Sequence, residues 1–377
     1  MVERALVGAD LFDGTRLWKN KAVVFADDQP VVVHEDNLPD NCMRINLNGG
    51  TLMPGFVDLQ VNGGGGIMFN VAPTLDGLRI IVAAHARLGT RGLLPTLITD
   101  TPAKTTAAIA ATKAAIGAGM HGILGLHLEG PHLSAARKGA HDATLIRQMT
   151  DSDCRELLHA AEDLPNLMVT VAPENVTCAQ ITALSDAGVI VFLGHSDADY
   201  ETTLAAFAAG AKGATHLFNA MSPLTSRAPG VVGATLNCAT AFAGLIADGI
   251  HVHPATIRTA LAANAGPGDV FLVTDAMAAV GSDISSFELG GRTILRQSGR
   301  LTLADGTLAG ADLEMAQALR VMIEDVGEAP ENAYRRATSI PSSVLRTPGT
   351  AGAWPKNIAD LIYLASDYSV KAASDLM

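Results

Sequence analysis

The sequence predicts an α/β protein built around a TIM-type (β/α)8 barrel. Short apolar segments alternate with alanine-rich stretches of helical period along most of the chain, which is typical of βα units and a parallel sheet. There are eight such segments. Polar side chains follow most of them, as they do at the active-site end of such a barrel. A doubly wound open sheet fits the same number of strands and stays open as an alternative.

The strands and helices of the barrel can be placed along the middle of the chain. Strands are expected at 52–60, 92–98, 123–129, 167–174, 189–195, 214–219, 242–248 and 270–276. Helices are expected at Leu75–Leu88, Pro102–Ile116, Ala143–Ala161, Tyr200–Ala209, Pro254–Ala263 and Leu313–Val326. Because helices fall between the strands, the strands can run parallel to one another.

Both ends of the chain have the character of β-structure. The β-branched runs at 22–25 and 31–33 are separated by turn residues, and 358–365 is typical of one more strand. We therefore expect residues 1–51 and 345–377 to form one small β unit. Residues 52–344 are expected to form the barrel, with a β-hairpin insertion at about 285–308.

Composition excludes several classes of protein. The chain has 377 residues, 48% of them hydrophobic, and its 26 basic and 38 acidic side chains give a net charge of −12. This negative charge disfavours binding to nucleic acid or to an anionic membrane. Glu3 and Asp10 interrupt the start of the chain where a signal peptide would be apolar, and the four cysteines form no C-x-x-C pair. We expect a cytoplasmic protein with reduced thiols and no membrane span.

Polar residues gather where the predicted strands end. They are Asp58, Gln60, Asn62, His127, Glu129, His195, His216, Asn219, Asp248, His251 and Asp275. In a barrel these side chains would meet at one rim, and imidazole with carboxylate is a ligand set that suits Zn²⁺. A single histidine after a strand is more often structural. The metal hypothesis therefore depends on Glu129, His195 and His216 taken together.

Other motifs give weaker signals. The glycine run Gly63–Gly66 lacks the spacing of a phosphate-binding loop, so it predicts a tight loop that lets backbone approach a neighbour. No G-x-S-x-G elbow is present, which disfavours a nucleophilic serine. Arg227 and Lys138, in loops after strand ends, are the candidates for binding an anionic ligand.

Seven segments carry recognisable motifs. They are PGFVDLQVNGGGG (54–66), GLHLEGPHLSAARKGAHD (125–142), LGHSDADY (193–200), GATHLFNAMSPLTSRAPGVVG (213–233), DGIHVHP (248–254), LVTDAMAAVG (272–281) and DGTLAGADLEM (305–315). In this order the chain resembles the N-acetylglucosamine-6-phosphate deacetylases of the amidohydrolase superfamily. The resemblance implies a metal-dependent barrel with a β-sandwich made from both chain ends. It also implies hydrolysis of the N-acetyl group of N-acetylglucosamine 6-phosphate to acetate and glucosamine 6-phosphate.

The same resemblance implies a role for each matching residue. Glu129, His195 and His216 would bind the metal, Asp275 would be the general base and acid, and His141 would polarise the acetyl carbonyl. Sugar contacts are implied for Ala140, Asn219, Ala220, Leu308 and Ala309. Phosphate contacts are implied for His251 and for Arg227, the latter reaching across from the second subunit of a homodimer.

The sequence also departs from the wider superfamily. Many members have His-x-His at the end of the first strand, where this chain has Gln60-Val61-Asn62. Amides are weaker ligands than imidazoles, so Gln60 and Asn62 would support the first metal or mark a vestigial second site. We predict one divalent metal per subunit, Zn²⁺ first, with Fe²⁺, Co²⁺ and Mn²⁺ also suited. His132 stands where relatives often have an aromatic residue, and the segment around Trp354 matches the family only loosely.

Two rival functions stay open at this point. The barrel could act on another N-acetylated sugar phosphate or on a different amide. It could also bind a phosphosugar without catalysis. The combination of Glu129, His195, His216 and Asp275 argues against a binding protein, because binding alone needs no activated water and no proton carrier.

Overall fold

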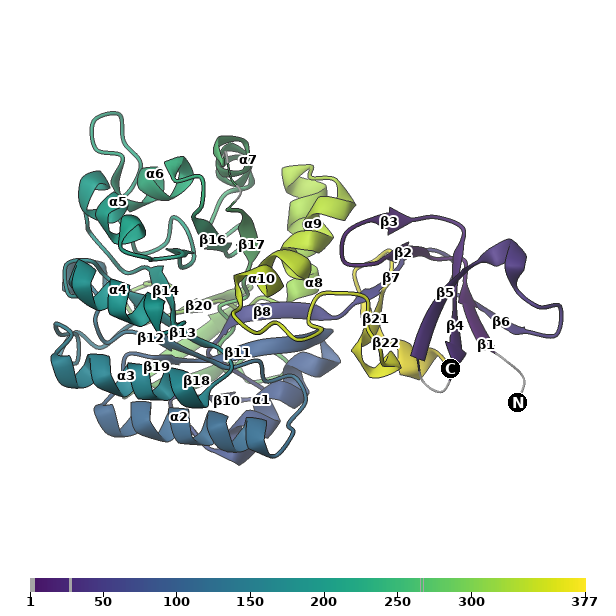
Figure 1. The fold of residues 1–377 in the computed structure, drawn as a ribbon, viewed down its shortest axis with the longest axis horizontal. Helices are drawn as coiled ribbons and strands as arrows, with labels where there is room; N and C mark the ends of the chain where they lie inside the picture. The colour runs from purple at the N-terminus through teal and green to yellow at the C-terminus, as the bar shows by residue number, and fades with distance from the viewer. Residues whose placement is uncertain (1–3, 27–28, 265, 267) are drawn as a thin grey trace.

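A closed barrel of parallel strands forms the centre of the computed structural model, which describes residues 4–26, 29–264, 266 and 268–377 (Figure 1). The strands neighbour one another in chain order. They are β8 (Phe56–Val61), β11 (Thr90–Ile98), β12 (Leu126–Glu129), β13 (Leu167–Val171), β14 (Ile190–Leu193), β15 (Gly213–Ala214), β16 (Phe242–Leu245) and β17 (Val270–Leu272). A parallel bridge between Val61 and Ala276 joins the last strand to the first. The predicted (β/α)8 barrel is confirmed, and the open doubly wound sheet, in which the strand order reverses, is excluded.

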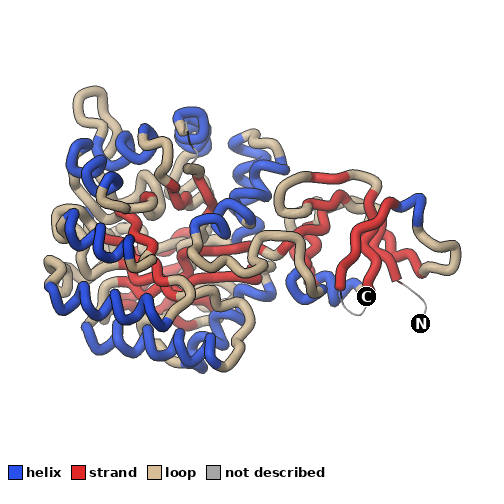
Figure 2. The backbone as a smooth tube through the Cα atoms, viewed as in Figure 1, coloured by secondary structure: helices blue, strands red, loops and turns tan. Residues whose placement is uncertain are grey.

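Helices surround the barrel, as Figure 2 shows in blue around the red strands. They are α1 (Leu75–Arg87), α2 (Pro102–Gly117), α3 (Asp151–Asp163), α4 (Cys178–Asp186), α5 (Tyr200–Ala208), α6 (Gly230–Asn237), α7 (Pro254–Ala263), α8 (Met315–Arg320), α9 (Pro330–Ala337) and α10 (Ser339–Val344). A π-helical stretch, Val321–Val326, continues α8. Short 3₁₀ helices lie at Glu35–Asn37, Ala135–Arg137, Ile358–Asp360 and Ala373–Leu376. Within the part of the chain that the structure describes, no helix has both the length and the hydrophobicity to cross a bilayer.

Side-chain caps fix where the outer helices begin. In five helices the residue before the helix accepts a hydrogen bond from the backbone N–H three residues later, which satisfies a donor that the helix itself leaves unpaired. These caps are Thr74, Thr101, Thr150, Thr177 and Asp199. Thr150 forms a full capping box with Asp153. The helix expected at Ala143–Ala161 therefore begins only at Asp151.

Several other predicted bounds were wrong. The strand expected at 52–60 is two strands, because β7 (Thr51–Pro54) pairs with β2 and β21 in a different sheet while β8 enters the barrel. The strand expected at 214–219 ends at Ala214, since His216 and Phe218 have positive φ angles that a strand cannot contain. Helices α4, α6, α9 and α10 were not predicted.

Strands from both chain ends build two further sheets beside the barrel (Figure 1). One sheet has the order β22-β21-β7-β2-β3, and the other has the order β5-β4-β1-β6. Their bounds are β1 (Arg4–Val7), β2 (Asp10–Phe12), β3 (Leu17–Trp18), β4 (Lys21–Ala26), β5 (Gln29–His34), β6 (Met43–Asn46), β21 (Leu361–Leu364) and β22 (Val370–Ala372). Leu6, Val23, Leu52 and Leu361 from the two sheets share one hydrophobic core.

The two sheets therefore form a sandwich with strands from both termini. We propose that this sandwich is a separate domain of about residues 1–54 and 345–377, because β7 lies within its five-stranded sheet. Trp354, in the segment that matches the family only loosely, packs beside this core and donates a 3.0 Å hydrogen bond from Nε1 to the Pro30 carbonyl.

The insertion near residues 285–308 is a three-stranded antiparallel sheet. It consists of β18 (Ser286–Leu289), β19 (Arg292–Gln297) and β20 (Arg300–Thr302). Leu289, Ile294 and Leu301 pack in one cluster with Ile98 and Met277, which line the cavity described below. A small hairpin, β9 (Gly63–Gly64) with β10 (Ile67–Met68), follows the first barrel strand.

Apolar and a few polar side chains fill the inside of the barrel below its rim, where His127 lies between the Leu59 carbonyl and Thr170 Oγ1. Phe192 and Phe271 make an edge-to-face contact with ring centroids 6.1 Å apart, and Leu59 and Met168 are buried in the same cluster. A barrel filled in this way is a packed core and leaves room for a ligand only at its ends.

Candidate active site

A cavity of about 390 Å³ opens at the carboxyl ends of the barrel strands. We call it the rim cavity. Most residues that the sequence singled out line it, namely Asn62, Glu129, Ala140, His141, His195, His216, Asn219, Ala220, His251, Asp275 and Leu308. Gln60 is buried and reaches two of these carboxylates through its amide, and Ala309 is buried behind Leu308. Arg227 and Lys138 are not among the lining residues, and Arg227 is exposed in a loop.

Three potential ligand atoms converge at the cavity floor. His216 Nε2 lies 3.0 Å from Glu129 Oε1, and His195 Nε2 lies 3.3 Å from the same oxygen. The two imidazole nitrogens are 3.1 Å apart. Ligands placed about 2.1 Å from a tetrahedral zinc ion are roughly 3.4 Å from one another, so this triangle has the dimensions of one face of such a site. The chemistry and spacing of the three residues fit a divalent metal.

Hydrogen bonds prepare two of these residues for metal binding. His195 Nδ1 donates to the Arg137 carbonyl at 2.8 Å, which leaves Nε2 as the nitrogen with the free lone pair. Burial alone would raise the pKa of Glu129, but the two neighbouring imidazoles of His195 and His216 hold it well below its usual range. Glu129 is therefore a carboxylate, which is the form that binds a metal.

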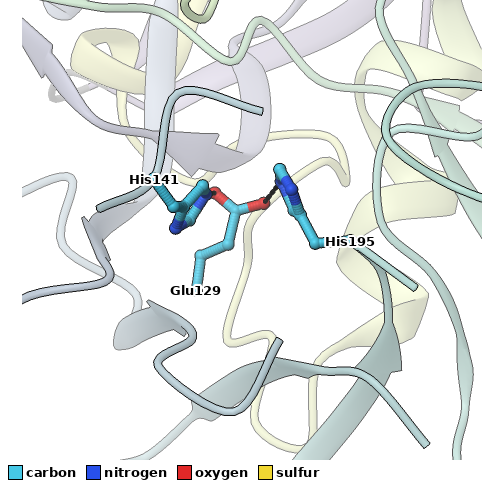
Figure 3. A group of neighbouring side chains, drawn as sticks. All are labelled: Glu129, His141 and His195. Atoms are coloured by element: carbon cyan, nitrogen blue, oxygen red, sulfur yellow. Dashed lines mark ion pairs between the residues drawn. The ribbon is translucent and has the colours of Figure 1, made fainter. Parts of the chain in front are cut away.

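His141 lies on the other side of Glu129 and forms a second, overlapping set with Glu129 and His195 (Figure 3). Its Nε2 is 3.9 Å from Glu129 Oε2. Thr99 meets His141 Nδ1 with its hydroxyl oxygen at 2.7 Å and with its backbone N–H at 3.3 Å, and the backbone N–H can only donate. Burial and the neighbouring His195 hold the pKa of His141 well below its usual range, so the ring is neutral. Its hydrogen is then on Nε2, which suits donation to a carbonyl oxygen better than metal binding.

Asp275 stands beside this cluster with two amide donors on one of its oxygens. Asn62 Nδ2 donates to Oδ1 at 2.6 Å and Gln60 Nε2 donates to it at 3.2 Å. Burial, followed by repulsion from Glu129, raises the pKa of Asp275 to about 6. A carboxyl group with a pKa near neutrality can both accept and return a proton, which is what a general base and acid must do.

Backbone strain is concentrated at the same residues. His195, His216 and Asp275 have φ angles of 46°, 30° and 51°, and Ala220 has one of 50°. Positive φ is uncommon outside glycine, costs free energy, and persists where the surrounding structure enforces it at functional sites. The strained turns lift these side chains out of the strands and into the rim cavity.

The glycine run after β8 holds the Asp275 loop in place. Gly63, Gly65 and Gly66 donate backbone hydrogen bonds of 2.8–3.0 Å to the carbonyls of Ala276, Val280 and Ala278, respectively. A Cβ on Gly63 would lie only 2.4 Å from the Ile67 carbonyl oxygen. The predicted close backbone approach is confirmed, and its partner is the loop that carries Asp275.

His251 enters the rim cavity from the loop after β16. Its Nδ1 donates to Asp248 Oδ2 at 2.6 Å, and the other oxygen of Asp248 accepts the backbone N–H of His251 at 2.7 Å. The Asp248 and His251 side chains are only 6% and 8% exposed. Asp248 thus fixes the ring so that Nε2 is the nitrogen left to meet a ligand.

Some residues of the site were not identified from the sequence. Ile98, Arg137, Ile246, Met277 and Thr307 also line the rim cavity, and Thr99 sets the tautomer of His141. The sequence gives little indication of these residues, because apolar and hydroxyl side chains have no distinctive ligand chemistry. His132 lines a separate, smaller cavity with Arg147 and Asp153, so in this chain it does not form the wall of the rim cavity.

Sequence comparisons find relatives that match most of this chain. The sequence profile of the amidohydrolase family matches residues 51–374. The N-acetylgalactosamine-6-phosphate deacetylase of Shewanella sp. (strain ANA-3) is 43% identical over 326 residues, covering 86% of this chain and 82% of the relative. The N-acetylglucosamine-6-phosphate deacetylase of Haemophilus influenzae is 35% identical over 344 residues, covering 90% and 89%.

Solved structures of deacetylases have the same fold as this chain. The crystal structure of N-acetylglucosamine-6-phosphate deacetylase from Pasteurella multocida matches with a TM-score of 0.90 at 32% identity, covering 98% of this chain and all of that one. A mutant of the Mycobacterium smegmatis enzyme in complex with N-acetyl-D-glucosamine-6-phosphate matches with a TM-score of 0.87 at 34% identity, covering 98% and 97%.

Proposed function

Because the chain belongs to the amidohydrolase family, we propose that it hydrolyses the N-acetyl group of N-acetylglucosamine 6-phosphate to give acetate and glucosamine 6-phosphate. The observation that carries this proposal is the triangle of Glu129, His195 and His216 ligand atoms beside Asp275. A metal site next to a carboxyl group with a raised pKa suits hydrolysis of an unactivated amide, which needs both an activated water and a proton for the leaving nitrogen.

Each residue has a separate task in the proposed reaction. A divalent ion held by Glu129, His195 and His216 would acidify water and polarise a carbonyl oxygen. Asp275 accepts the proton of the attacking water and later delivers it to the leaving amine. The neutral His141 ring donates its Nε2 hydrogen to the acetyl oxygen as negative charge develops there.

We propose Zn²⁺ as the ion, with one per chain. Two imidazoles and a carboxylate suit Zn²⁺, and they also accept Fe²⁺, Co²⁺ or Mn²⁺. Gln60 and Asn62 turn their amide nitrogens toward Glu129 and Asp275, respectively. An amide binds a metal through its oxygen, which is a weaker ligand than an imidazole nitrogen, so these residues support the first site better than they would form a second.

The sugar phosphate would occupy the rest of the rim cavity. Asn219, Ala220, Ala140 and the backbone near Leu308 and Ala309 are the proposed sugar contacts, and His251 is the proposed phosphate contact on this chain. We propose that Arg227 completes the phosphate site of the partner in a cytoplasmic homodimer, because it is exposed and outside the cavity of its own chain. Arg227→Ala should then raise KM while changing kcat little, and an unchanged KM would contradict the phosphate role.

N-acetylgalactosamine 6-phosphate is a second candidate substrate. The Shewanella relative named for that sugar is 43% identical, against 35% for the Haemophilus relative named for the glucosamine compound. The two sugars differ only in the configuration at C4. Comparing kcat/KM for both substrates with one enzyme preparation would decide which of them the cavity favours.

The main experiment is acetate release by the purified protein from both sugar phosphates. Release should stop after chelation and return when Zn²⁺ is added. Failure of the fully metallated protein to release acetate from either compound would overturn the proposed function, and would favour another amide substrate.

A pair of variants tests the ligand set. His216→Ala should lose both bound metal and activity, since it removes one corner of the triangle. His141→Ala should lose activity by about a hundredfold or more and keep its metal, because the ring acts on the carbonyl. Metal analysis of washed proteins separates the two, and loss of metal from His141→Ala alone would assign the site to the overlapping set.

A further inference from the structure

One buried acceptor in the rim cavity has no partner. Asn62 is 1% exposed, and its Oδ1 receives no hydrogen bond from any residue that the structure describes. A buried polar atom without a partner costs free energy, and such atoms are rare in folded proteins. Because Asn62 also lines the cavity, a ligand can supply the missing donor.

The orientation of the Asn62 amide is fixed by its neighbour. Its nitrogen donates to Asp275 Oδ1 at 2.6 Å, and a carboxylate oxygen can only be faced by the NH₂ side of the amide. The backbone is held as well, since the Asn62 N–H donates to Ala276 and its carbonyl accepts from Phe69, both at 2.8 Å. Oδ1 is therefore a rigid acceptor that none of the described residues uses.

The two carboxylate oxygens of Asp275 also differ in their hydrogen-bond partners. Its Oδ1 accepts from both Asn62 and Gln60, while no donor within the described ranges meets its Oδ2. Oδ2 is then the oxygen available to exchange a proton. The free acceptor of Asn62 and the free oxygen of Asp275 belong to two side chains that are hydrogen-bonded to each other, so they can face one ligand atom together.

We propose that Asn62 Oδ1 accepts a hydrogen bond from the N–H of the scissile amide and holds the leaving nitrogen beside Asp275 Oδ2. This inference rests on the proposed amide hydrolysis. A secondary amide has one N–H donor, which must find an acceptor once the substrate is buried. Water adds its oxygen to the acetyl carbon and its proton passes to Asp275. When the carbon–nitrogen bond breaks, Asp275 returns that proton to the nitrogen, which keeps its original hydrogen on Asn62.

An ester analogue separates this contact from a structural role. The 2-O-acetyl analogue, with a 2-hydroxyl sugar phosphate as its leaving group, has no N–H. Asn62→Ala should lower kcat/KM for the N-acetyl substrate about tenfold more than for the ester, because only the amide loses a hydrogen bond. Gln60→Leu is the matched control, since it removes a donor to the same oxygen of Asp275 and should affect both substrates alike.

Each outcome of this experiment has a clear meaning. Equal losses on the two substrates in Asn62→Ala would show that Asn62 acts only by positioning Asp275, and would overturn the inference. Failure of the unmodified enzyme on the N-acetyl substrate would instead overturn the proposed function.

A binding experiment covers the case in which Asn62→Ala has too little activity to measure. Calorimetry in an Asp275→Asn background should show tighter binding of the amide than of the ester. Adding Asn62→Ala should remove that preference, and a preference that survives the substitution would contradict the inference.

Discussion

The two ends of the barrel use charged residues in opposite ways. At the carboxyl ends of the strands, Glu129 and Asp275 are buried without a lysine or arginine partner among the described residues, and their backbone neighbourhood is strained. At the amino ends, Arg91, Lys212 and Arg336 bind backbone carbonyls or carboxylates that precede or support the strands. The first arrangement leaves acceptors open to a ligand, whereas in the second each of the three cations is paired within the protein.

This difference teaches where function and stability are located. Carboxylates and imidazoles that repel or compete with one another lower stability but provide proton transfer and metal binding. Cations at helix ends and strand starts contribute to stability and carry no chemistry. Substitutions at the rim should therefore change activity more than stability, and substitutions at the opposite end should do the reverse.

The largest effect is expected for Asp275→Asn at the rim. An amide cannot carry the proton from water to the leaving amine, so kcat should fall about a thousandfold. Bound metal and thermal stability should be nearly unchanged, since Asp275 is not in the metal triangle. Asp283→Asn, at an exposed position in the following loop, is the control. A fall in kcat of less than tenfold, measured by steady-state kinetics, would rule out Asp275 as the general base.

At the amino ends of the barrel strands, Arg336→Met should give the largest effect, which should be a loss of stability. Arg336 contacts Asp269 at 2.6 Å and Glu328 at 2.8 Å, and its side chain is only 11% exposed. Removing it leaves the Glu328 side chain, which is only 9% exposed, without its partner, and this should lower the free energy of unfolding by about 3 kcal/mol. Denaturant unfolding measures the loss, with Arg335→Met at an exposed site on the same helix as control. A fall in kcat/KM of the folded protein would contradict the division between the two ends.

Asp248→Asn should have a smaller effect on substrate binding. In the native protein the Asp248 carboxylate accepts the hydrogen of His251 Nδ1. In the variant the amide can turn its NH₂ group toward Nδ1, so this hydrogen bond is lost. KM for the phosphorylated sugar should rise about tenfold while kcat changes little, in keeping with the loss of one charge-assisted hydrogen bond. Inorganic phosphate should also inhibit the variant more weakly. A fall in kcat at constant KM would place His251 in the chemistry instead.

The smallest effect is expected for Lys212→Met at the amino ends. Lys212 Nζ donates at 2.6 Å to the carbonyl of Val344, the last residue of α10. Loss of this cation at a helix C-terminus should lower stability by about 1 kcal/mol without changing kcat/KM. Lys371→Met, at an exposed position, should leave the unfolding midpoint where it is. A loss as large as that of Arg336→Met would mean that Lys212 supports more than the end of one helix.

The barrel could be predicted because parallel strands are buried on both faces and therefore appear as continuous apolar runs. Bounds failed where tertiary structure overrides the local pattern. The strand expected at 214–219 stops at Ala214, because His216 and Phe218 adopt left-handed backbone conformations. Helix α6 is buried along nearly its whole length, so it lacks the polar face that reveals a helix. Helix α4 could have been found from the capping box of Thr177 and Gln180.

The site was partly predictable for a different reason. Strand ends in a barrel meet at one rim, so residues as distant as Glu129 and Asp275 could be grouped from their positions alone. The tautomer of His141 could not, because it depends on a backbone N–H of Thr99 that has no sequence signature. The free acceptor of Asn62 is also visible only in three dimensions, since the sequence suggests a weak metal ligand at that position.

The central claim is that a single metal bound by Glu129, His195 and His216 supports amide hydrolysis at the rim. The most direct measurement is acetate release from the chelated protein as Zn²⁺ is added in known amounts. Activity should rise linearly and stop rising at one ion per chain. A break at two ions per chain, or acetate release that does not depend on metal, would contradict the account.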